Sequence, residues 1–233
     1  MSKTITYVGA GAFRSGTGAL TGATAVNFNA GIRTGDLLFI LIHSVNETIT
    51  IPTGWTEVGD QTVQAVGTAA AQEAVRLAVC YKFAVTPEAS VTIADSGNLT
   101  CAQSMAFRFV NRYNPFIATS GGAQASTTAN TTLPAITTTV PESLILFAMA
   151  VGEDNASTAN FTSLTNANLT GITERIDQTV NTQTGGGLAA WTATSTLARN
   201  IGTSTAAKNG AWLDSTAYLT IGLRPAARRF SIT

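Results

Sequence analysis

The sequence predicts an all-β protein, folded as a single antiparallel β-sandwich with two pseudo-repeated halves. Three observations lead to this fold class: short runs in which apolar and polar residues alternate, turn-forming residues between the runs, and a strand pattern that occurs twice. Many short strands with turns every ~8–12 residues indicate a sandwich or a barrel. No segment shows a sustained helical stripe.

Alternation is clearest in Val75–Phe83, where every second residue is apolar or aromatic, while Arg76 and Lys82 fall on the other face. Residues 105–109 and 219–223 alternate in the same way. We therefore expect a strand in each of these runs. Turn-forming residues lie between such runs, at Pro52–Gly54, Asp95–Asn98, Ser120–Gly122 and Gly185–Gly187.

The strand pattern repeats in the same order along the chain. Gly35–Ile42 resembles Glu142–Met149, and Thr56–Val63 matches Thr173–Val180 with six identities in eight positions. Two shorter apolar runs repeat as well, and the offset between the copies drifts from 107 to 117 residues. Insertions in loops produce such a drift, so we predict an internal duplication.

We expect the two copies to build one sandwich in which each half closes the core of the other, rather than two small sandwiches. Each copy supplies only about five or six strands, and the connection from Asn111 to Thr132 has no long charged or Pro-rich spacer. The expected organisation is an N-terminal arm (1–20), the sandwich (21–224, with halves at about 21–110 and 128–224) and a C-terminal tail (225–233).

Two runs, Leu37–Ile42 and Leu144–Val151, are apolar on both faces. An exposed antiparallel strand normally alternates, so something must cover the outer face of these strands. The chain's own long loops are one candidate and a neighbouring subunit is the other. The second would make the protein a component of an assembly.

The composition combines 45% hydrophobic residues with only 11% charged ones and a net charge of zero. A neutral chain offers no general electrostatic case for binding nucleic acid or an anionic membrane. The N-terminus lacks the apolar core of a signal peptide, and the longest apolar runs are far shorter than a membrane span. We therefore expect a soluble protein made in a cytoplasm, with Cys80 and Cys101 as free thiols.

Residues suited to catalysis are scarce. His43 is the only histidine, and the adjacent Ser44 points to the opposite face of a strand, so the two cannot easily form a base–nucleophile pair. The glycine-rich stretch 9–18 has Thr17 where a phosphate-binding loop needs lysine. Paired carboxylates, as glycoside hydrolysis would need, recur beside the repeated strand: Glu57 with Asp60, and Glu174 with Asp177. A structural role at a turn explains both pairs. We expect that the protein is not an enzyme.

No metal or cofactor site is expected either. One histidine and two separated cysteines cannot build a zinc site. The acidic triplet 153–155 lacks the alternating pattern of a calcium loop and is interpreted as a solvated turn.

Four residues are candidates for contact with a partner. Trp55 follows the Pro52–Gly54 turn, where it can either cap the core or, with Trp191 and Trp212, stack on a sugar. Arg224, Arg228 and Arg229 form the densest basic cluster, which can dock on an acidic neighbour or stay solvated. The contact candidates are therefore Trp55, Arg224, Arg228 and Arg229.

The order of these motifs resembles a broad group of bacteriophage virion proteins. The resemblance is carried by Thr34–Phe39, then Pro52–Thr56 with its Pro-x-Gly-Trp, then Leu77–Lys82 and a Phe-rich closing strand, and it covers about Thr21 to Arg224. It implies a jelly-roll-like sandwich of the kind found as capsid decoration proteins or as tail and fibre components. The second copy has no Pro-x-Gly-Trp before Thr173, so only the first would present a contact surface at that turn.

Taken with the low charge and the two-faced strands, the resemblance implies a structural virion protein. The leading hypothesis is a capsid decoration, or cement, protein that binds the major capsid protein or other virion proteins and stabilises the head shell. It would be present in many copies or as a homo-oligomer on the particle, with no cofactor, nucleic acid or membrane. The alternative is a carbohydrate- or receptor-binding module of a tail fibre, and a hydrolase is the third hypothesis.

Overall fold

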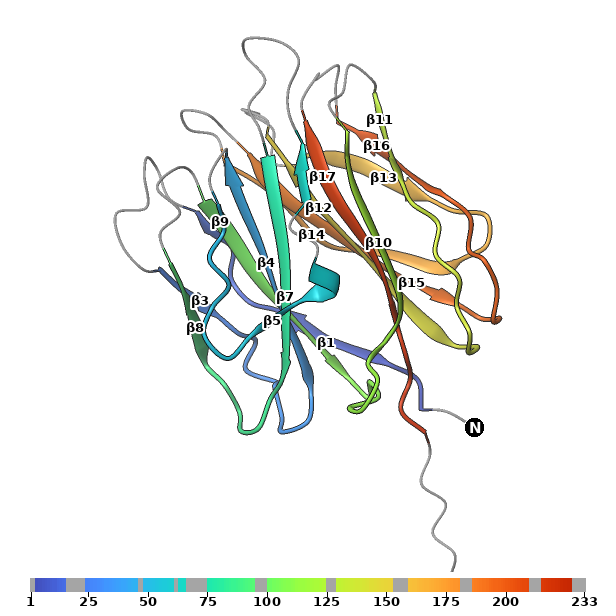
Figure 1. Cartoon of the computed structure of the whole chain (residues 1–233), viewed down its shortest axis with the longest axis horizontal. Helices are drawn as coiled ribbons and strands as arrows, with labels where there is room; N and C mark the ends of the chain where they lie inside the picture. Colours follow the sequence, from blue (N-terminus) through green and yellow to red (C-terminus); the bar gives the residue numbers. More distant parts are fainter. Residues whose placement is uncertain are drawn as a thin grey trace, which may run out of the picture.

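The computed structural model describes residues 3–15, 24–45, 48–60, 63–65, 75–94, 100–124, 129–152, 159–180, 186–209 and 215–227. This part of the chain is all-β, and its only helical element is a single 3-10 turn, η1 (Val58–Asp60). The strands form four antiparallel sheets (Figure 1). No helix in the described ranges is long and apolar enough to cross a membrane.

The first half of the chain forms a seven-stranded sheet and a two-stranded sheet. In the larger sheet the spatial order is β1 (Thr6–Ala10), β9 (Thr100–Arg108), β4 (Leu37–Val45), β7 (Val75–Phe83) and β5 (Thr56–Glu57), while β2 (Arg14–Ser15) pairs with β9 and β6 (Val63–Ala65) with β7. The smaller sheet pairs β3 (Thr24–Asn27) with β8 (Ser90–Ile93).

The second half forms a five-stranded sheet and a three-stranded sheet. The larger has the order β10 (Phe116–Gln124), β17 (Thr216–Leu223), β12 (Ser143–Val151), β15 (Gly187–Ser195) and β14 (Thr170–Thr179). The smaller has the order β11 (Asn130–Leu133), β16 (Ser204–Lys208) and β13 (Phe161–Thr165).

The two large sheets share one hydrophobic core. Leu37, Phe39 and Leu41 of β4 belong to the same buried cluster as Leu144 and Leu146 of β12. The alternation expected for Val75–Phe83 is present, because the odd-numbered residues of β7 face this core. Burial of these apolar side chains, each worth roughly 1.5–3 kcal/mol, stabilises the contact between the sheets.

The outer face of each large sheet is covered by the chain itself. Leu38 and Ile40 of β4 pack in a second cluster with Val26 of β3 and Ile93 of β8. In the other half, Phe147 of β12 packs in a third cluster with residues of β11, β13 and β16. The two-faced strands therefore need no neighbouring subunit, and they no longer argue for one.

A segment expected as a turn and one expected as an arm are strands in the structure. Ser120–Gly122, expected as a turn, lies within β10, where a Cβ on Gly122 would come within 2.9 Å of the Tyr218 ring. Glycine is therefore needed for packing at this position of the strand. At the N-terminus, expected as an arm, β1 and β2 are hydrogen-bonded to β9 as part of the large sheet.

The cysteines are free, as expected, and lie on opposite faces of the first large sheet. Cys80 packs in the outer cluster and Cys101 in the central one. Burial, together with the nearby Glu57, raises the pKa of Cys80 to about 12, and burial also raises the pKa of Cys101. Neither thiol is a reactive thiolate at neutral pH.

Candidate functional site

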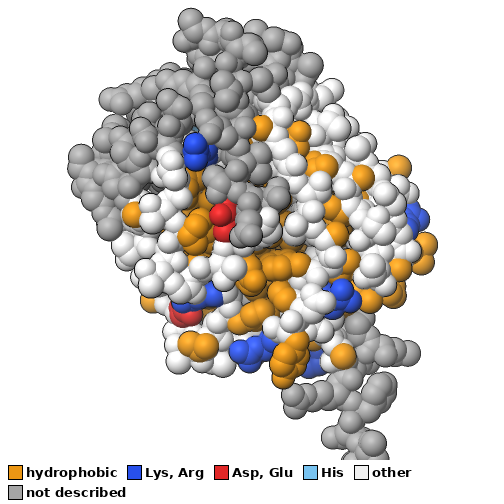
Figure 2. Space-filling model, viewed as in Figure 1, with side chains coloured by type: hydrophobic (Ala, Val, Ile, Leu, Met, Phe, Trp, Pro, Cys, Tyr) orange, Lys and Arg blue, Asp and Glu red, His pale blue; other side chains and the backbone are white. Residues whose placement is uncertain are grey.

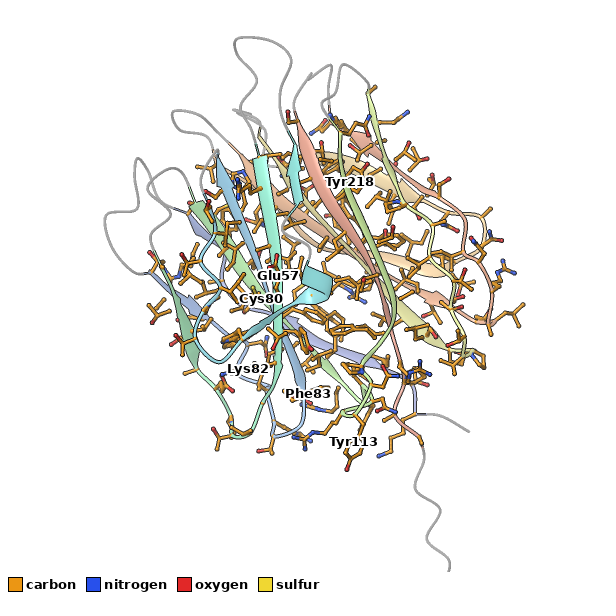
Figure 3. The ribbon with its side chains drawn as sticks, in the orientation of Figure 1. Glu57, Cys80, Lys82, Phe83, Tyr113 and Tyr218 are labelled. Atoms are coloured by element: carbon orange, nitrogen blue, oxygen red, sulfur yellow. The ribbon has the colours of Figure 1, made fainter. Side chains whose placement is uncertain are left out.

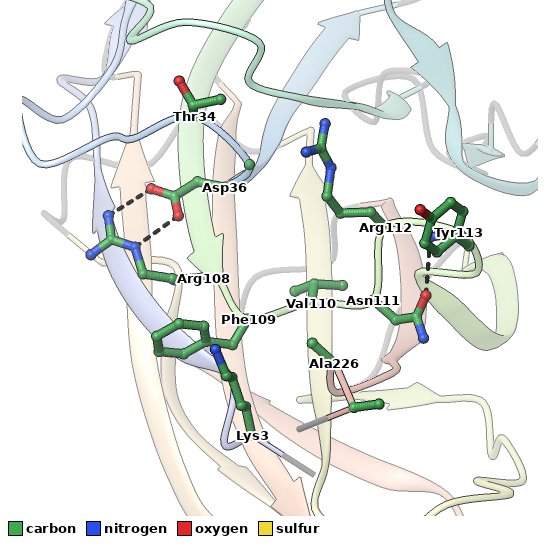
Figure 4. Close-up of a pocket in the computed structure, with 12 residues that line it drawn as sticks. Lys3, Thr34, Asp36, Arg108, Phe109, Val110, Asn111, Arg112, Tyr113 and Ala226 are labelled. Atoms are coloured by element: carbon green, nitrogen blue, oxygen red, sulfur yellow. Dashed lines mark hydrogen bonds and ion pairs between the residues drawn. The ribbon is translucent and has the colours of Figure 1, made fainter. Parts of the chain in front are cut away.

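A cleft of about 810 Å³ opens at the end of the molecule where both ends of the described chain lie (Figure 4). Its lining comes from four places in the sequence: the N-terminal segment, the turn before β4, the end of β9 with the connection that follows it, and the C-terminal segment. The side chains that carry charge or aromatic character there are Lys3, Asp36, Arg108, Phe109, Arg112 and Tyr113.

Backbone hydrogen bonds tie these distant segments together. The Lys3 N–H donates to the Ala226 carbonyl at 2.9 Å, and the Ala226 N–H donates to the Phe109 carbonyl at 2.8 Å. Val110 and Pro225 form an isolated antiparallel bridge beside them. Both ends of the described chain are thus fixed on the connection between the two halves.

A bidentate ion pair forms one wall of the cleft. Arg108 donates from Nε and Nη2 to the two carboxylate oxygens of Asp36, at 2.8 and 2.7 Å. The Asp36 side chain is only 2% exposed, and it also accepts a bond from the Arg33 N–H. The hydrogen bond to Asp36 raises the pKa of Arg108, so the guanidinium is a fixed cation with its charge already matched.

Two further cations are held by aromatic rings rather than by carboxylates. Lys3 Nζ lies 4.8 Å from the centre of the Phe109 ring, and the Arg112 guanidinium lies 5.6 Å from that of Phe83. Neither takes part in an ion pair within the described part of the chain. The cleft therefore carries an excess of positive charge in a protein whose net charge is zero.

Exposed aromatic side chains stand beside these cations. Tyr113 is 97% exposed and Phe109 is 40% exposed. Asn111 Oδ1 accepts bonds from the N–H groups of Tyr113 and Asn114, which holds the turn that presents the tyrosine. Figure 3 labels Tyr113 at the lower end of the molecule, where Figure 2 shows Lys and Arg side chains next to hydrophobic ones.

Phe109 also has an unusual backbone. Its φ of 67° lies in the left-handed region, which a bulky residue adopts only when its surroundings hold it there. The alternation expected over residues 105–109 therefore ends one residue early, since Met105 and Phe107 enter the central core and Phe109 turns out to the cleft. This departure puts an aromatic side chain at the surface.

The predicted contact residues lie in different places. Trp55 is 8% exposed, stacks on Phe28 with a 1° interplanar angle and has Lys82 Nζ 5.1 Å from its ring centre. Its ring is thus a core surface in the outer cluster and not a stacking platform. Arg224 donates its N–H to the Pro115 carbonyl next to the cleft, whereas Arg228 and Arg229 lie outside the described residues.

The other tryptophans do not complete a platform in the described structure. Trp191 is buried in the outer core of the second half, edge-on to Phe161 at 5.5 Å. Trp212 lies outside the described residues.

Of the candidate catalytic groups, His43 is buried, Asp177 is half-buried and Glu174 is exposed. His43 is fully buried with Nδ1 3.4 Å from Cys101 Sγ, and burial lowers its pKa to about 3. Asp177 accepts the N–H groups of Asn160 and Phe161, at 2.7 and 3.0 Å, so it fixes the start of β13. Burial raises the pKa of Glu174, as does the neighbouring Asp177.

The remaining catalytic and metal candidates are only partly described. Glu57 lies in β5, while the side chain of Asp60, the acidic triplet 153–155 and residues 16–18 of the glycine-rich stretch fall outside the described residues. Among the residues that the structure describes, no three His, Cys, Asp or Glu side chains gather as a metal site would require.

Most of the cleft could not be found from the sequence. Lys3, Asp36 and Arg112 carry no shared motif, and only folding brings them together. A local signal exists in Asn111–Pro115, where turn-forming residues follow the closing strand and surround an Arg-Tyr pair.

No protein-family model matches the chain, and no curated protein matches it either. The geometry of the cleft is therefore the main basis for a functional argument.

Proposed function

We propose that the protein is a structural virion protein, a capsid decoration protein that binds and stabilises the head shell through its cleft end. The observation that carries the proposal is the convergence of both ends of the described chain with the inter-half connection on one positively charged, aromatic-lined cleft. Such an end can fix the orientation of the whole molecule on a partner. A terminal attachment of this kind suits a protein bound in many copies to a shell.

The proposal includes an internally duplicated, jelly-roll-like fold. In one large sheet β4 lies between β9 and β7, and in the other β12 lies between β17 and β15. β1 extends the first sheet beyond β9 as β10 extends the second beyond β17. The outer pairs β3–β8 and β11–β16 also correspond, so the same strand order supports a duplication.

The chemistry of the cleft favours an acidic partner surface. Lys3 and Arg112 lack carboxylate partners among the described residues, and an acidic side chain of a capsid protein would supply them. Tyr113 adds a large, nearly fully exposed ring of the type enriched at protein interfaces. Arg228 and Arg229 follow Ala227, which lines the cleft, so the basic tail continues the same charge.

A structural role also agrees with the lack of a reactive centre in the described chain. His43 stays neutral and buried, and both thiols are protonated. A general base must reach a substrate with its proton-accepting atom, which a fully buried imidazole cannot do. We accordingly propose that the protein is not an enzyme and needs no cofactor.

The experiment is reconstitution on head shells prepared without the protein. Wild type should co-sediment with the shells and raise their melting temperature, and binding should weaken with salt because the contact is charged. The double variant Lys3→Glu/Arg112→Glu should lose most of the binding. The matched control is Arg14→Glu, an exposed arginine of β2 that does not line the cleft. Equal binding by all three proteins, or immunolabel confined to the tail tip, refutes the proposal.

One observation favours the alternative, a receptor-binding module of a tail fibre. An exposed Tyr113 beside cations that have no carboxylate partner among the described residues is a surface on which an anionic sugar can stack and pair its charge. A glycan array separates the two hypotheses, since Tyr113→Ala should abolish a glycan signal if the cleft is a sugar site. Wild type that binds no glycan dismisses this alternative.

A further inference from the structure

The outer sheet of the first half leaves one strand edge open. β8 pairs only with β3 in the described chain, and both lie at the left side of Figure 1. An unpaired strand edge offers a row of N–H and C=O groups to any extended segment that reaches it.

The hydrogen-bonding pattern shows which groups of β8 are open. The Phe28 N–H donates to the Ala89 carbonyl, and Val26 lies opposite Val91 two residues along each strand. In an antiparallel pair, every second residue exchanges both backbone hydrogen bonds with its partner strand. The backbone N–H and C=O of Val91 therefore face β3, while those of Ser90 and Thr92 point away from β3. By the same alternation, the backbone groups of Asn27 point away from β8, and the Asn27 carbonyl accepts a hydrogen bond from the Ser104 hydroxyl.

In the second half the corresponding edge is filled. β16 pairs with β11 on one side and with β13 on the other. In the first half, the segment 48–53 follows β4 as β13 follows β12, but it forms no ladder with β8. The described part of the first half thus lacks one strand that the second half has.

A groove of about 440 Å³ lies where that strand is missing. Val91, Thr92 and Ala94 form one wall, and residues 50–53 form the other. Charged side chains and prolines commonly protect a strand edge against the addition of another strand. No charged side chain lines this groove, and β8 contains no proline. The groove is uncharged and is flanked by backbone groups of β8 that pair with no other described strand.

We propose that this edge takes the C-terminal segment 228–233 of a second copy of the chain as an added strand. The segment reads Arg-Arg-Phe-Ser-Ile-Thr, which alternates apolar and hydroxyl residues as β8 itself does. Six extended residues span about 20 Å, enough to pair along all of β8. Two arginines separate the pairing residues from Ala227.

The donor is a second copy because of where the chain runs. After β17, residues 224–226 are bonded to the connection that follows β9 at the cleft end. In Figure 1 this C-terminal stretch lies at the lower end of the molecule, to the right of β8. The contact joins different surfaces of the two copies, so it is heterologous and builds a ring or an open chain of subunits. It goes beyond the proposed function and does not depend on it.

The test compares the full chain with a truncation that ends at Ala227. Sedimentation velocity should show concentration-dependent oligomers for the full chain and monomers for the truncation. A fluorescent peptide with the sequence of residues 227–233 should bind the truncation, measured by anisotropy. Replacing Phe230 and Ile232 of the peptide by serine should weaken binding at least ten-fold.

Two controls assign the contact to the β8 edge. Thr92→Pro removes the open N–H without touching the bonds to β3 and should abolish peptide binding, whereas Thr92→Ala keeps the N–H and should bind as wild type does. If Thr92→Pro fails to fold, a peptide methylated on alternate backbone nitrogens tests the same bonds from the donor side.

Three outcomes overturn the proposal. The first is a truncation that does not bind the peptide. The second is an oligomer that persists without residues 228–233. The third is a monomeric full chain whose truncation binds the peptide, which would mean that the tail docks on its own copy.

Discussion

The contact between the two large sheets can be tested at Gly186, just before β15. Its φ is +122°, and a Cβ there would lie 2.5 Å from Cε1 and 3.0 Å from Nε2 of His43. His43 belongs to the other half and is fully buried, so its ring has no space into which to move. Gly186→Ala therefore combines an unfavourable backbone with a steric clash across the central core.

The magnitude of each effect follows from a matched control. Gly54 has φ +79°, and an added Cβ would meet nothing within 4 Å, so Gly54→Ala measures the backbone effect alone, about 1–2 kcal/mol. The clash adds the cost of overpacking, about 1–3 kcal/mol. We expect Gly186→Ala to lower the free energy of unfolding by about 2–5 kcal/mol in urea denaturation, with an unchanged dependence on urea.

A double variant assigns the loss to His43. In Gly186→Ala/His43→Ala the methyl group occupies space that the ring has vacated, so the two effects should fall short of their sum by about 1–2 kcal/mol. If Gly186→Ala is no more destabilising than Gly54→Ala, the two halves do not pack against each other as described.

Three further outcomes are expected. Burial lowers the pKa of His43 from 6.5 to about 3, so as the pH falls the unfolded state binds a proton before the folded state does. The free energy of unfolding should therefore fall by up to roughly 4 kcal/mol between pH 6.5 and pH 3. His43→Gln should remove this decrease from the pH profile of urea unfolding. Cys80 and Cys101 should react with a thiol reagent only under denaturing conditions, and fast labelling of the native protein would contradict their burial. Asp36→Asn, in the buried pair with Arg108, should lower the free energy of unfolding by about 2–4 kcal/mol. Glu88→Gln, in the more exposed pair with Lys82, should lower it by less than about 1 kcal/mol. Equal losses would show that burial does not set the contribution of an ion pair to stability.

The strand pattern could be predicted because it is local. Val75–Phe83 reveals its core face by period two, and Leu37–Ile42, which is apolar on both faces, enters both the central and the outer cluster. Free thiols at Cys80 and Cys101 were expected on a different ground, a reducing compartment, and both cysteines are free in the structure.

Ser120–Gly122 escaped prediction because two glycines in a row have the composition of a turn. The reason for a glycine at position 122 is the ring of Tyr218, a partner almost a hundred residues away that no local pattern reveals. Trp55 was ambiguous for the same reason, since a tryptophan after a turn can face the core or solvent, and only the position of Phe28 decides. The cleft was missed because its residues meet through long-range pairing alone.

The covering of the outer faces changes where a partner is to be sought. From the sequence, the two-faced strands Leu37–Ile42 and Leu144–Val151 required either the chain's own segments or another subunit, and β3, β8, β11, β13 and β16 supply the cover. The buried apolar faces are thereby satisfied within one chain. What is left without a partner in the described structure is of a different kind: cations at the cleft and backbone groups along β8. Contacts through such groups are directional, so they fix the orientation of a subunit, whereas an apolar face mainly supplies affinity. An assembly built from this chain should therefore depend on salt at the cleft end and on strand pairing at β8, and these two dependences can be measured independently.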